Sequence, residues 1–222
     1  MSHVEMWNIG YDQRPTTNDQ RPTTYDSRPM SRKKENVRLL IEHIEEELSQ
    51  WLFLEYKHST EIWLNSQFNN LKNKKIYNRL KRLSSVDERS VVEFADNDKT
   101  LVLDPQAELS LKPTDFENKK YIVVGGILGN NPMLGRTKKY ISDKLPNATK
   151  RNLGKKQLSI DSTVFVARLI YEGIHLEEIE LTNEVELKLN DNHSIILPYA
   201  YPVIDDTLII TPGLIKYLVN SE

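Results

Sequence analysis

Apolar and polar positions follow two different periods along the first half of the folded part of the chain. Residues 37–41 are a short run of β-branched and apolar side chains, which predicts a first strand. A helical spacing of apolar residues begins at Leu48 and reaches residues 62–63. Residues 64–83 mix apolar positions with many Asn, Lys and Arg residues, and they predict an exposed connection that contains helix.

The middle of the chain carries the strongest strand signals. Residues 91–94 and 101–105 are strand-like, and residues 121–124 form a continuous apolar run of the kind found in strands buried on both faces. That run passes directly into the glycine loop, Gly125-Gly126-Ile127-Leu128-Gly129. We therefore expect a buried strand that ends in a sharp turn.

The last third of the chain predicts one helix followed by smaller elements. Apolar residues at positions 164–170 predict a helix that ends at Gly173, a residue typical of helix C-termini. Residues 178–189 alternate like a strand or a hairpin, and Pro212 suits the first turn of a final helix. Further apolar runs lie at residues 195–197 and 208–210.

Strands that alternate with helices predict an α/β fold with a mainly parallel sheet. Ligands in such sheets bind beyond the carboxyl ends of the strands. Asp104-Pro105 and the glycine loop both follow predicted strands, so we expect them at one edge of the sheet.

The first 36 residues have a different composition. Units of seven residues that start at Tyr11, Asn18 and Tyr25 each carry an Arg-Pro pair. Their prolines and few apolar residues exclude a coiled coil and predict disorder. We therefore divide the chain into a disordered Arg-Pro repeat tail, residues 1–36, and a folded domain, residues 37–222. A partner-binding tail and an upstream extension before a start at Met30 are the alternatives.

Composition and charge narrow the class of protein. The chain has 30 Lys and Arg against 32 Asp and Glu, with a net charge of -2, so it lacks the basic excess typical of proteins that bind nucleic acid through phosphates. Residues 72–82 are the most basic stretch. The chain has no cysteine, its five histidines show no metal-ligand spacing, and it has no apolar run long enough for a membrane span. We expect a cytoplasmic protein without a metal site and without a membrane association.

The glycine loop permits close approach of a ligand to the backbone, because glycine has no Cβ atom. Its spacing differs from the dinucleotide-binding G-x-G-x-x-G turn, and the Gly-Lys-Ser/Thr of a phosphate loop is absent. From the pattern alone, a ligand loop and a purely structural turn remain equally open.

Several acidic residues follow the first strand and enter the first helix. Glu45 belongs to a set that would also suit a helix N-terminus, whereas Glu55 lies among apolar neighbours, where a carboxylate is unusual. His43 has the chemistry of a base or a ligand, although a structural histidine is the commoner outcome. We take Glu42, Glu45, Glu55 and His43 as candidate catalytic residues.

Residues 37–175 resemble the SPOUT-type protein arginine methyltransferases known from fungi, with archaeal relatives, and the remainder matches more loosely. The matching motifs occur in a fixed order: Leu40-Ile41-Glu42-His43-Ile44-Glu45-Glu46, Trp51, Leu54-Glu55-Tyr56, Leu103-Asp104-Pro105, the glycine loop, Asn131-Pro132, Arg136-Thr137, Arg151-Asn152-Leu153-Gly154 and Lys156-Gln157-Leu158-Ser159-Ile160-Asp161.

The resemblance implies a SPOUT methyltransferase fold with a deep trefoil knot in its C-terminal part, and S-adenosylmethionine bound among the knot loops. By position, the cofactor residues would be Leu103, Asp104, Pro105, Gly125, Gly126, Ile127, Leu128, Gly129, Arg151, Leu153, Gly154 and Gln157. It also implies an arginine of a uS3-like small-subunit ribosomal protein as the acceptor, and it favours a monomer.

The chemistry fits the candidate carboxylates. A guanidinium stays protonated in water, and carboxylates can orient it through bidentate hydrogen bonds. We expect Glu42, Glu45 and Glu55 to hold the acceptor arginine. An RNA methyltransferase, favoured by residues 72–82, is the alternative enzyme, and a ribosome-associated binding module without turnover is the non-enzymatic one.

Overall fold

The computed structural model describes residues 36–129, 134–190 and 193–220. Its centre is a six-stranded sheet in the order β3-β2-β1-β5-β4-β6, in which every pair of neighbours is parallel. The strands are β1 (Arg38–His43), β2 (Ser66–Asn69), β3 (Ser85–Val86), β4 (Thr100–Leu103), β5 (Tyr121–Gly126) and β6 (Thr149–Arg151). The predicted α/β class with a mainly parallel sheet is confirmed.

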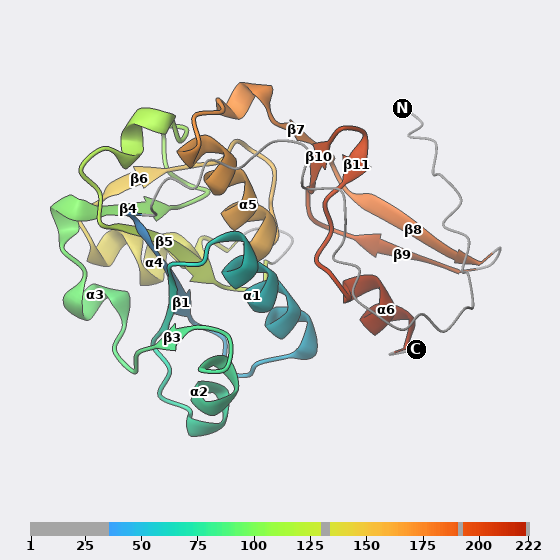
Figure 1. Cartoon of the computed structure of the whole chain (residues 1–222), viewed down its shortest axis with the longest axis horizontal. Helices are drawn as coiled ribbons and strands as arrows, with labels where there is room; N and C mark the ends of the chain where they lie inside the picture. The colour runs from blue at the N-terminus through green and yellow to red at the C-terminus, as the bar shows by residue number, and fades with distance from the viewer. Residues whose placement is uncertain (1–35, 130–133, 191–192, 221–222) are drawn as a thin grey trace. The chain divides into compact units, whose positions relative to one another are not determined.

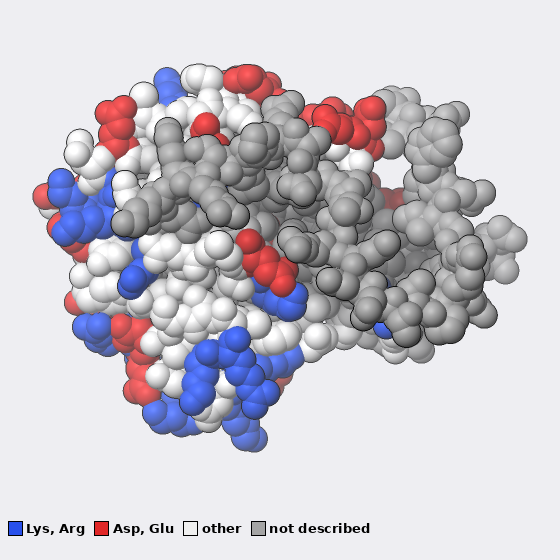
Figure 2. All heavy atoms as spheres, in the orientation of Figure 1, with Lys and Arg blue, Asp and Glu red and all other residues white. Residues whose placement is uncertain are grey.

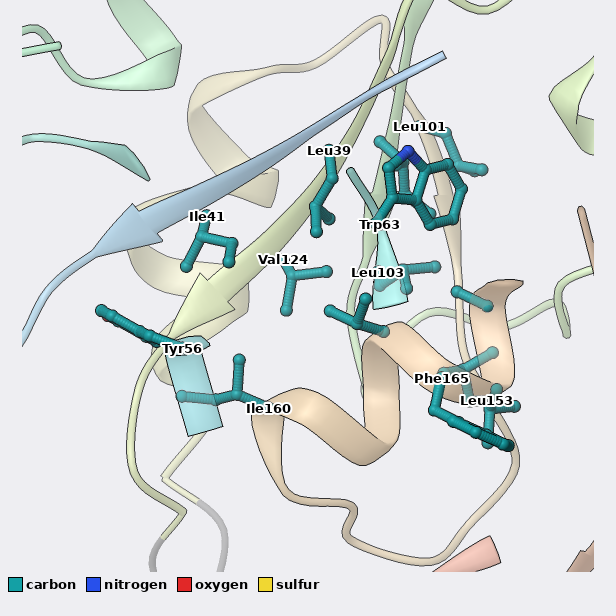
Figure 3. Packing of buried hydrophobic residues seen from close by; sticks show 14 of the residues in the cluster. Leu39, Ile41, Tyr56, Trp63, Leu101, Leu103, Val124, Leu153, Ile160 and Phe165 are labelled. Carbon is teal, nitrogen blue, oxygen red and sulfur yellow. The ribbon is translucent and has the colours of Figure 1, made fainter. Parts of the chain in front are cut away.

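Both faces of the sheet are covered, which explains why its central strands are apolar at nearly every position. Helices α1 (Gln50–Ile62) and α5 (Ile160–Tyr171) pack together on one face, in front of the strands in Figure 1. In Figure 3, Ile41 and Val124 point from neighbouring strands toward the layer that holds Tyr56 and Ile160. Trp63 and Phe165 complete this larger core.

A smaller core covers the opposite face. Leu40, Val102 and Val123 of the strands pack there against Val91 and Ile141. The elements on this side are α3 (Val91–Phe94) and α4 (Arg136–Tyr140), whereas α2 (Lys74–Leu80) packs on the larger core. Short 3₁₀ helices lie at Asn97–Lys99, Pro113–Phe116, Ser142–Lys144 and Leu176–Glu178.

The C-terminal part adds small antiparallel elements beside α1. They are a three-stranded sheet in the order β11-β10-β7, a hairpin of β8 and β9, and a final helix α6. A third cluster joins Trp51 of α1 to Tyr199, Tyr201 and Leu218. The bounds are β7 (Glu180–Leu181), β8 (Val185–Asn190), β9 (His193–Leu197), β10 (Pro202–Ile204), β11 (Thr207–Leu208) and α6 (Leu214–Val219).

Two predicted elements differ from the structure. Residues 91–94, predicted as a strand, form the single helical turn α3, because the Ser90 hydroxyl and the Glu93 carboxylate make a capping box. Residues 64–83 contain the buried strand β2 as well as the expected helix. The predicted tail lies outside the described residues except for its last position. Within the described part of the chain, no helix has the length and apolarity needed to cross a membrane.

Candidate active site

A cleft opens at the carboxyl ends of β4, β5 and β6, as expected for a parallel sheet. The empty space within it, which includes a part open to solvent, is about 900 Å³. The segments after these three strands form its walls, and the first turn of α5 adds Ile160 and Thr163. The structure therefore brings together loops that lie far apart in the sequence.

All the predicted cofactor residues except Gly126 line this cleft. They are Leu103, Asp104, Pro105, Gly125, Ile127, Leu128, Gly129, Arg151, Leu153, Gly154 and Gln157. Gly126 serves the fold instead, because a Cβ atom there would lie 2.1 Å from the Tyr56 hydroxyl oxygen and 2.9 Å from the backbone oxygen of Glu42.

Two charged residues of the cleft, Asp104 and Arg151, form hydrogen bonds that hold its loops in place. The Asp104 carboxylate accepts hydrogen bonds from the Gln106 backbone N–H at 2.9 Å and from the Ser142 hydroxyl at 2.6 Å. The Arg151 guanidinium makes a bidentate pair with Asp115, with N···O distances of 2.9 and 2.7 Å. These contacts fix the conformations of the loops that follow β4 and β6.

Gly129 allows two other segments to approach the glycine loop closely. A Cβ atom at Gly129 would lie 1.6 Å from Gln157 Nε2 and 2.8 Å from a ring carbon of Tyr199. The Tyr199 hydroxyl also donates a hydrogen bond to the Gly129 carbonyl at 3.4 Å. The neighbouring motif residues Asn131 and Pro132 lie outside the described residues.

Several further residues line the cleft that are not among the predicted cofactor residues. The polar ones are Gln106, Arg136, Thr137, Asn152, Lys156 and Thr163. Arg136-Thr137 and Asn152 belong to motifs that carried the family resemblance, which was the available signal. Gly135, also in the wall, has a φ of +62°, so its conformation favours glycine.

Glu45 connects the end of the first strand to the glycine loop. Its Oε1 accepts a hydrogen bond from the Leu128 backbone N–H at 2.8 Å and lies 3.0 Å from a guanidinium nitrogen of Arg136. Arg136 also donates a hydrogen bond to the Leu128 carbonyl. Glu45 and Arg136 are both partly exposed; Arg136 lines the cleft, whereas Glu45 lies outside the lining residues and reaches the cleft wall through Arg136 and Leu128.

Glu55 is almost completely buried between α1 and α5. Its carboxyl accepts hydrogen bonds from Trp51 Nε1 at 2.6 Å and from the Ile160 backbone N–H at 3.1 Å. Burial, reinforced by the negative charge of Asp161, raises the pKa of Glu55. The first-turn N–H groups of a helix lack intrahelical partners, so Glu55 also holds the start of α5 in place.

Asp161 is the centre of a second buried network, which the sequence analysis noted only as part of a motif. Its Oδ2 lies 2.7 Å from His58 Nδ1 and accepts a 2.7 Å hydrogen bond from the Thr211 hydroxyl. Its Oδ1 accepts one from the Ser159 hydroxyl at 2.7 Å. Asp161 therefore joins α1, α5 and the C-terminal segment.

Glu42 contacts different elements of the fold from those that Glu45 and Glu55 contact. Its carboxylate accepts hydrogen bonds from the Ser90 hydroxyl and from the Val91 backbone N–H, the latter at 2.9 Å, so it caps α3 on the opposite face of the sheet. Burial raises the pKa of Glu42, although these hydrogen bonds oppose the shift. This geometry gives Glu42 a structural role instead of the expected contact with an acceptor arginine.

His43 is buried against α1. Its Nδ1 lies 2.9 Å from the Tyr56 hydroxyl, and its Nε2 has no hydrogen-bond partner among the described residues. Burial lowers the pKa of His43 to about 4, so the imidazole is neutral at physiological pH. The Tyr56 hydroxyl also donates to the Gly126 carbonyl at 3.3 Å, and this contact ties His43 to the base of the glycine loop.

Comparisons with known proteins assign the fold and the family. The family model described as "Protein arginine N-methyltransferase SFM1-like" matches residues 38–222. The chain is 30% identical to the protein arginine N-methyltransferase SFM1 of Saccharomyces cerevisiae over 183 residues, which cover 74% of this chain and 85% of the yeast protein.

Solved structures agree. The yeast arginine methyltransferase SFM1 complexed with SAM superimposes with a TM-score of 0.77 at 27% identity, covering 83% of this chain and 91% of that one. A dual-specific Trm10 of Thermococcus kodakaraensis shares the fold, with a TM-score of 0.54 at 18% identity over 64% of this chain and 96% of that one. The fold is therefore of the SPOUT type, and the chain belongs to the SFM1-like protein arginine N-methyltransferase family.

Proposed function

We propose that this protein transfers a methyl group from S-adenosylmethionine to an arginine side chain of a protein. The observation that carries the proposal is the cleft at the ends of β4, β5 and β6, whose walls are the motifs shared with the family. The similar yeast SFM1 has been solved complexed with SAM and with SAH, which supports this cofactor for the cleft.

The residues of the cleft fit this cofactor. Apolar side chains such as Leu103, Leu153 and Leu158 can cover an adenine ring, and the backbone of the glycine loop lines the same cleft at Gly125. Arg136 supplies a positive charge for a carboxylate. The bound sulfonium would supply an activated methyl group. A trefoil knot, which the family resemblance predicts, would bring three such loops together, and it remains a prediction.

The acceptor arginine would be held beside Glu45. A guanidinium nitrogen that forms a new N–C bond must give up a proton, because the methylated product carries the same single positive charge. Glu45 is partly exposed and already binds one guanidinium, that of Arg136, so its carboxylate suits both the orientation of an arginine and the acceptance of a proton. Buried Glu55 would act indirectly, by fixing Trp51 and the start of α5.

We further propose a uS3-like small-subunit ribosomal protein, free or within the ribosomal subunit, as the acceptor. Glu45 is followed by the exposed residues Glu46 and Glu47, and this acidic segment suits the basic sequences around an acceptor arginine. A cytoplasmic location and a monomeric state complete the proposal, in keeping with the family resemblance.

Incubation with radiolabelled S-adenosylmethionine and small ribosomal subunits tests this function. We expect label that is protease-sensitive and nuclease-resistant, and that localises to one small-subunit protein. Nuclease-sensitive label would favour the alternative of RNA methylation, for which the lysines around α2 are the motivating observation. A Gly129→Trp variant, whose side chain would have to displace Gln157 and Tyr199, is the control for label that does not depend on this site, and a thermal melt confirms that it is folded.

A further inference from the structure

A row of cations projects from α2 and the turn that follows it. Residues 72–82 contain six Lys and Arg side chains and no acidic residue. Most are exposed, and Figure 2 shows blue side chains gathered over α2 at the lower end of the view. We define the α2 cationic row as Lys72, Lys74, Lys75, Lys81 and Arg82.

The row is presented on a firmly attached helix. Ile76 and Leu80 bury the opposite side of α2 in the larger core. Arg79 stacks its guanidinium 4.0 Å from the centre of the Phe53 ring and donates to the Leu48 carbonyl at 3.3 Å. Arg79 is thus an anchor to α1, and the exposed cations keep a fixed position beside it.

Most of the row is not neutralised by neighbouring acids. Lys74 pairs with Glu88 at 2.5 Å. In contrast, Lys72, Lys75, Lys81 and Arg82 form no ion pair with any residue that the structure describes. A chain with a net charge of -2 therefore keeps a local surface of four uncompensated positive charges.

The α2 cationic row lies near the acidic segment that we propose for the acceptor. Arg79 contacts Leu48 and Gln50, which follow the acidic segment at Glu45, Glu46 and Glu47. The surface thus has an acidic side, which suits an arginine-bearing basic sequence, and a cationic side, which would repel that sequence. A partner of the row must be anionic and distinct from the acceptor segment.

We propose that the α2 cationic row binds the phosphodiester backbone of RNA and so docks the enzyme on RNA next to its protein acceptor. The identity of the anion as RNA rests on the proposed ribosomal acceptor. Helix α2 alone rises by about 9 Å from Lys74 to Leu80, and the row extends beyond both of its ends, so it is long enough to contact more than one phosphate. Four cations without an ion-pair partner among the described residues suit a backbone that carries a charge at every phosphate better than a folded acidic protein surface.

The test compares two triple variants by fluorescence anisotropy with a short labelled single-stranded RNA, without cofactor or acceptor. The first is Lys72→Gln, Lys75→Gln and Lys81→Gln in the row. The matched control is Lys112→Gln, Lys120→Gln and Lys216→Gln, which removes three exposed lysines elsewhere. Thermal melts confirm that both variants remain folded.

We expect the row variant to bind RNA at least about tenfold more weakly than the wild type, and the control to stay within about twofold. The slope of log K against log salt should fall by about 2 in the row variant, at about 0.7 for each lost phosphate contact of a single strand. Equal losses in both variants, no RNA binding by the wild type at about 50 mM salt, or equally strong competition by poly-glutamate would overturn the proposal. Methylation of a free acceptor peptide should be unchanged in the row variant, so failure of RNA docking and failure of the proposed activity are distinguishable.

Discussion

The Glu45 carboxylate accepts a hydrogen bond from the Leu128 backbone N–H at 2.8 Å, across 83 positions of sequence. One acidic side chain therefore positions the glycine loop and pairs with Arg136, which lines the cleft. In the proposed function, cofactor binding and acceptor binding would meet at Glu45, and two substitutions separate the two roles.

Glu45→Gln keeps an oxygen for Leu128 N–H but removes the negative charge. We expect methyl transfer to fall at least about tenfold while the cofactor Kd, measured by isothermal titration calorimetry, changes less than about threefold. Glu45→Ala also removes the hydrogen bond that holds Leu128 of the glycine loop. A hydrogen bond to a charged group is worth about 1.5 kcal/mol or more, so we expect the cofactor Kd of Glu45→Ala to rise about tenfold. Glu117→Gln, at an exposed position outside the acidic segment, is the control, and equal cofactor losses for the two Glu45 variants would contradict the separation.

Glu55 should make stability depend on pH. Burial and Asp161 raise its pKa from 4.5 to about 8 in the folded protein, so the folded state holds a proton that the unfolded state releases between these values. The contribution is complete below about pH 4.5 and is lost as the pH rises through about 8. We expect the Tm of Glu55→Gln, relative to the wild type, to increase steadily from pH 5 to pH 8.

A constant difference between the two melting temperatures over this range would show that Glu55 keeps an ordinary pKa. The amide of Glu55→Gln places a donor against Trp51 or Ile160, but that cost does not vary with pH and so leaves the slope interpretable. Glu47→Gln, at an exposed position, should track the wild type at every pH.

Replacing Gly126 or Gly129 with alanine should affect different properties of the protein, namely its stability and its cofactor binding. Gly126→Ala forces Cβ against the Tyr56 hydroxyl and the Glu42 backbone, and such overpacking costs about 1–3 kcal/mol of stability. Gly129→Ala meets the flexible end of Gln157, which lines the cleft, and a ring carbon of Tyr199 at 2.8 Å, so both side chains must shift. We therefore expect a lower Tm as the main effect of Gly126→Ala, and weaker cofactor binding with a smaller loss of Tm for Gly129→Ala. The reverse pattern would contradict the structural assignment of the two glycines.

His43 should remain neutral throughout the physiological range. Burial lowers its pKa from 6.5 to about 4, so its contribution to stability is present above about pH 6.5 and is lost as the pH falls through about 4. In an NMR titration of the imidazole signals, His43 should show no protonation down to pH 5. A midpoint near 6.5 would mean that the ring is solvated and available as a base.

The sequence predicts the central strands and the main helices because their apolar residues form continuous runs or recur at helical spacing. Val91–Phe94 was predicted as a strand since β-branched residues dominate it, but the capping box of Ser90 and Glu93 and the carboxylate of Glu42 favour a helical turn. The glycine loop and the loops after β4 and β6 were predicted from motifs. The roles of Glu42 and Arg136 could not be predicted from the sequence. The alternation of side chains along β1 decides which face of the sheet Glu42 reaches, and only the fold brings Arg136 to Glu45.

The most direct measurement of the central claim is amino-acid analysis of the acceptor after reaction with radiolabelled S-adenosylmethionine. Acid hydrolysis of the labelled small-subunit protein should release the label as methylarginine, and a folded Gly129→Trp variant, in which Gln157 and Tyr199 are displaced, should give none. Label recovered as methylated nucleosides, or as any other methylated amino acid, would contradict the proposed arginine methyltransferase activity.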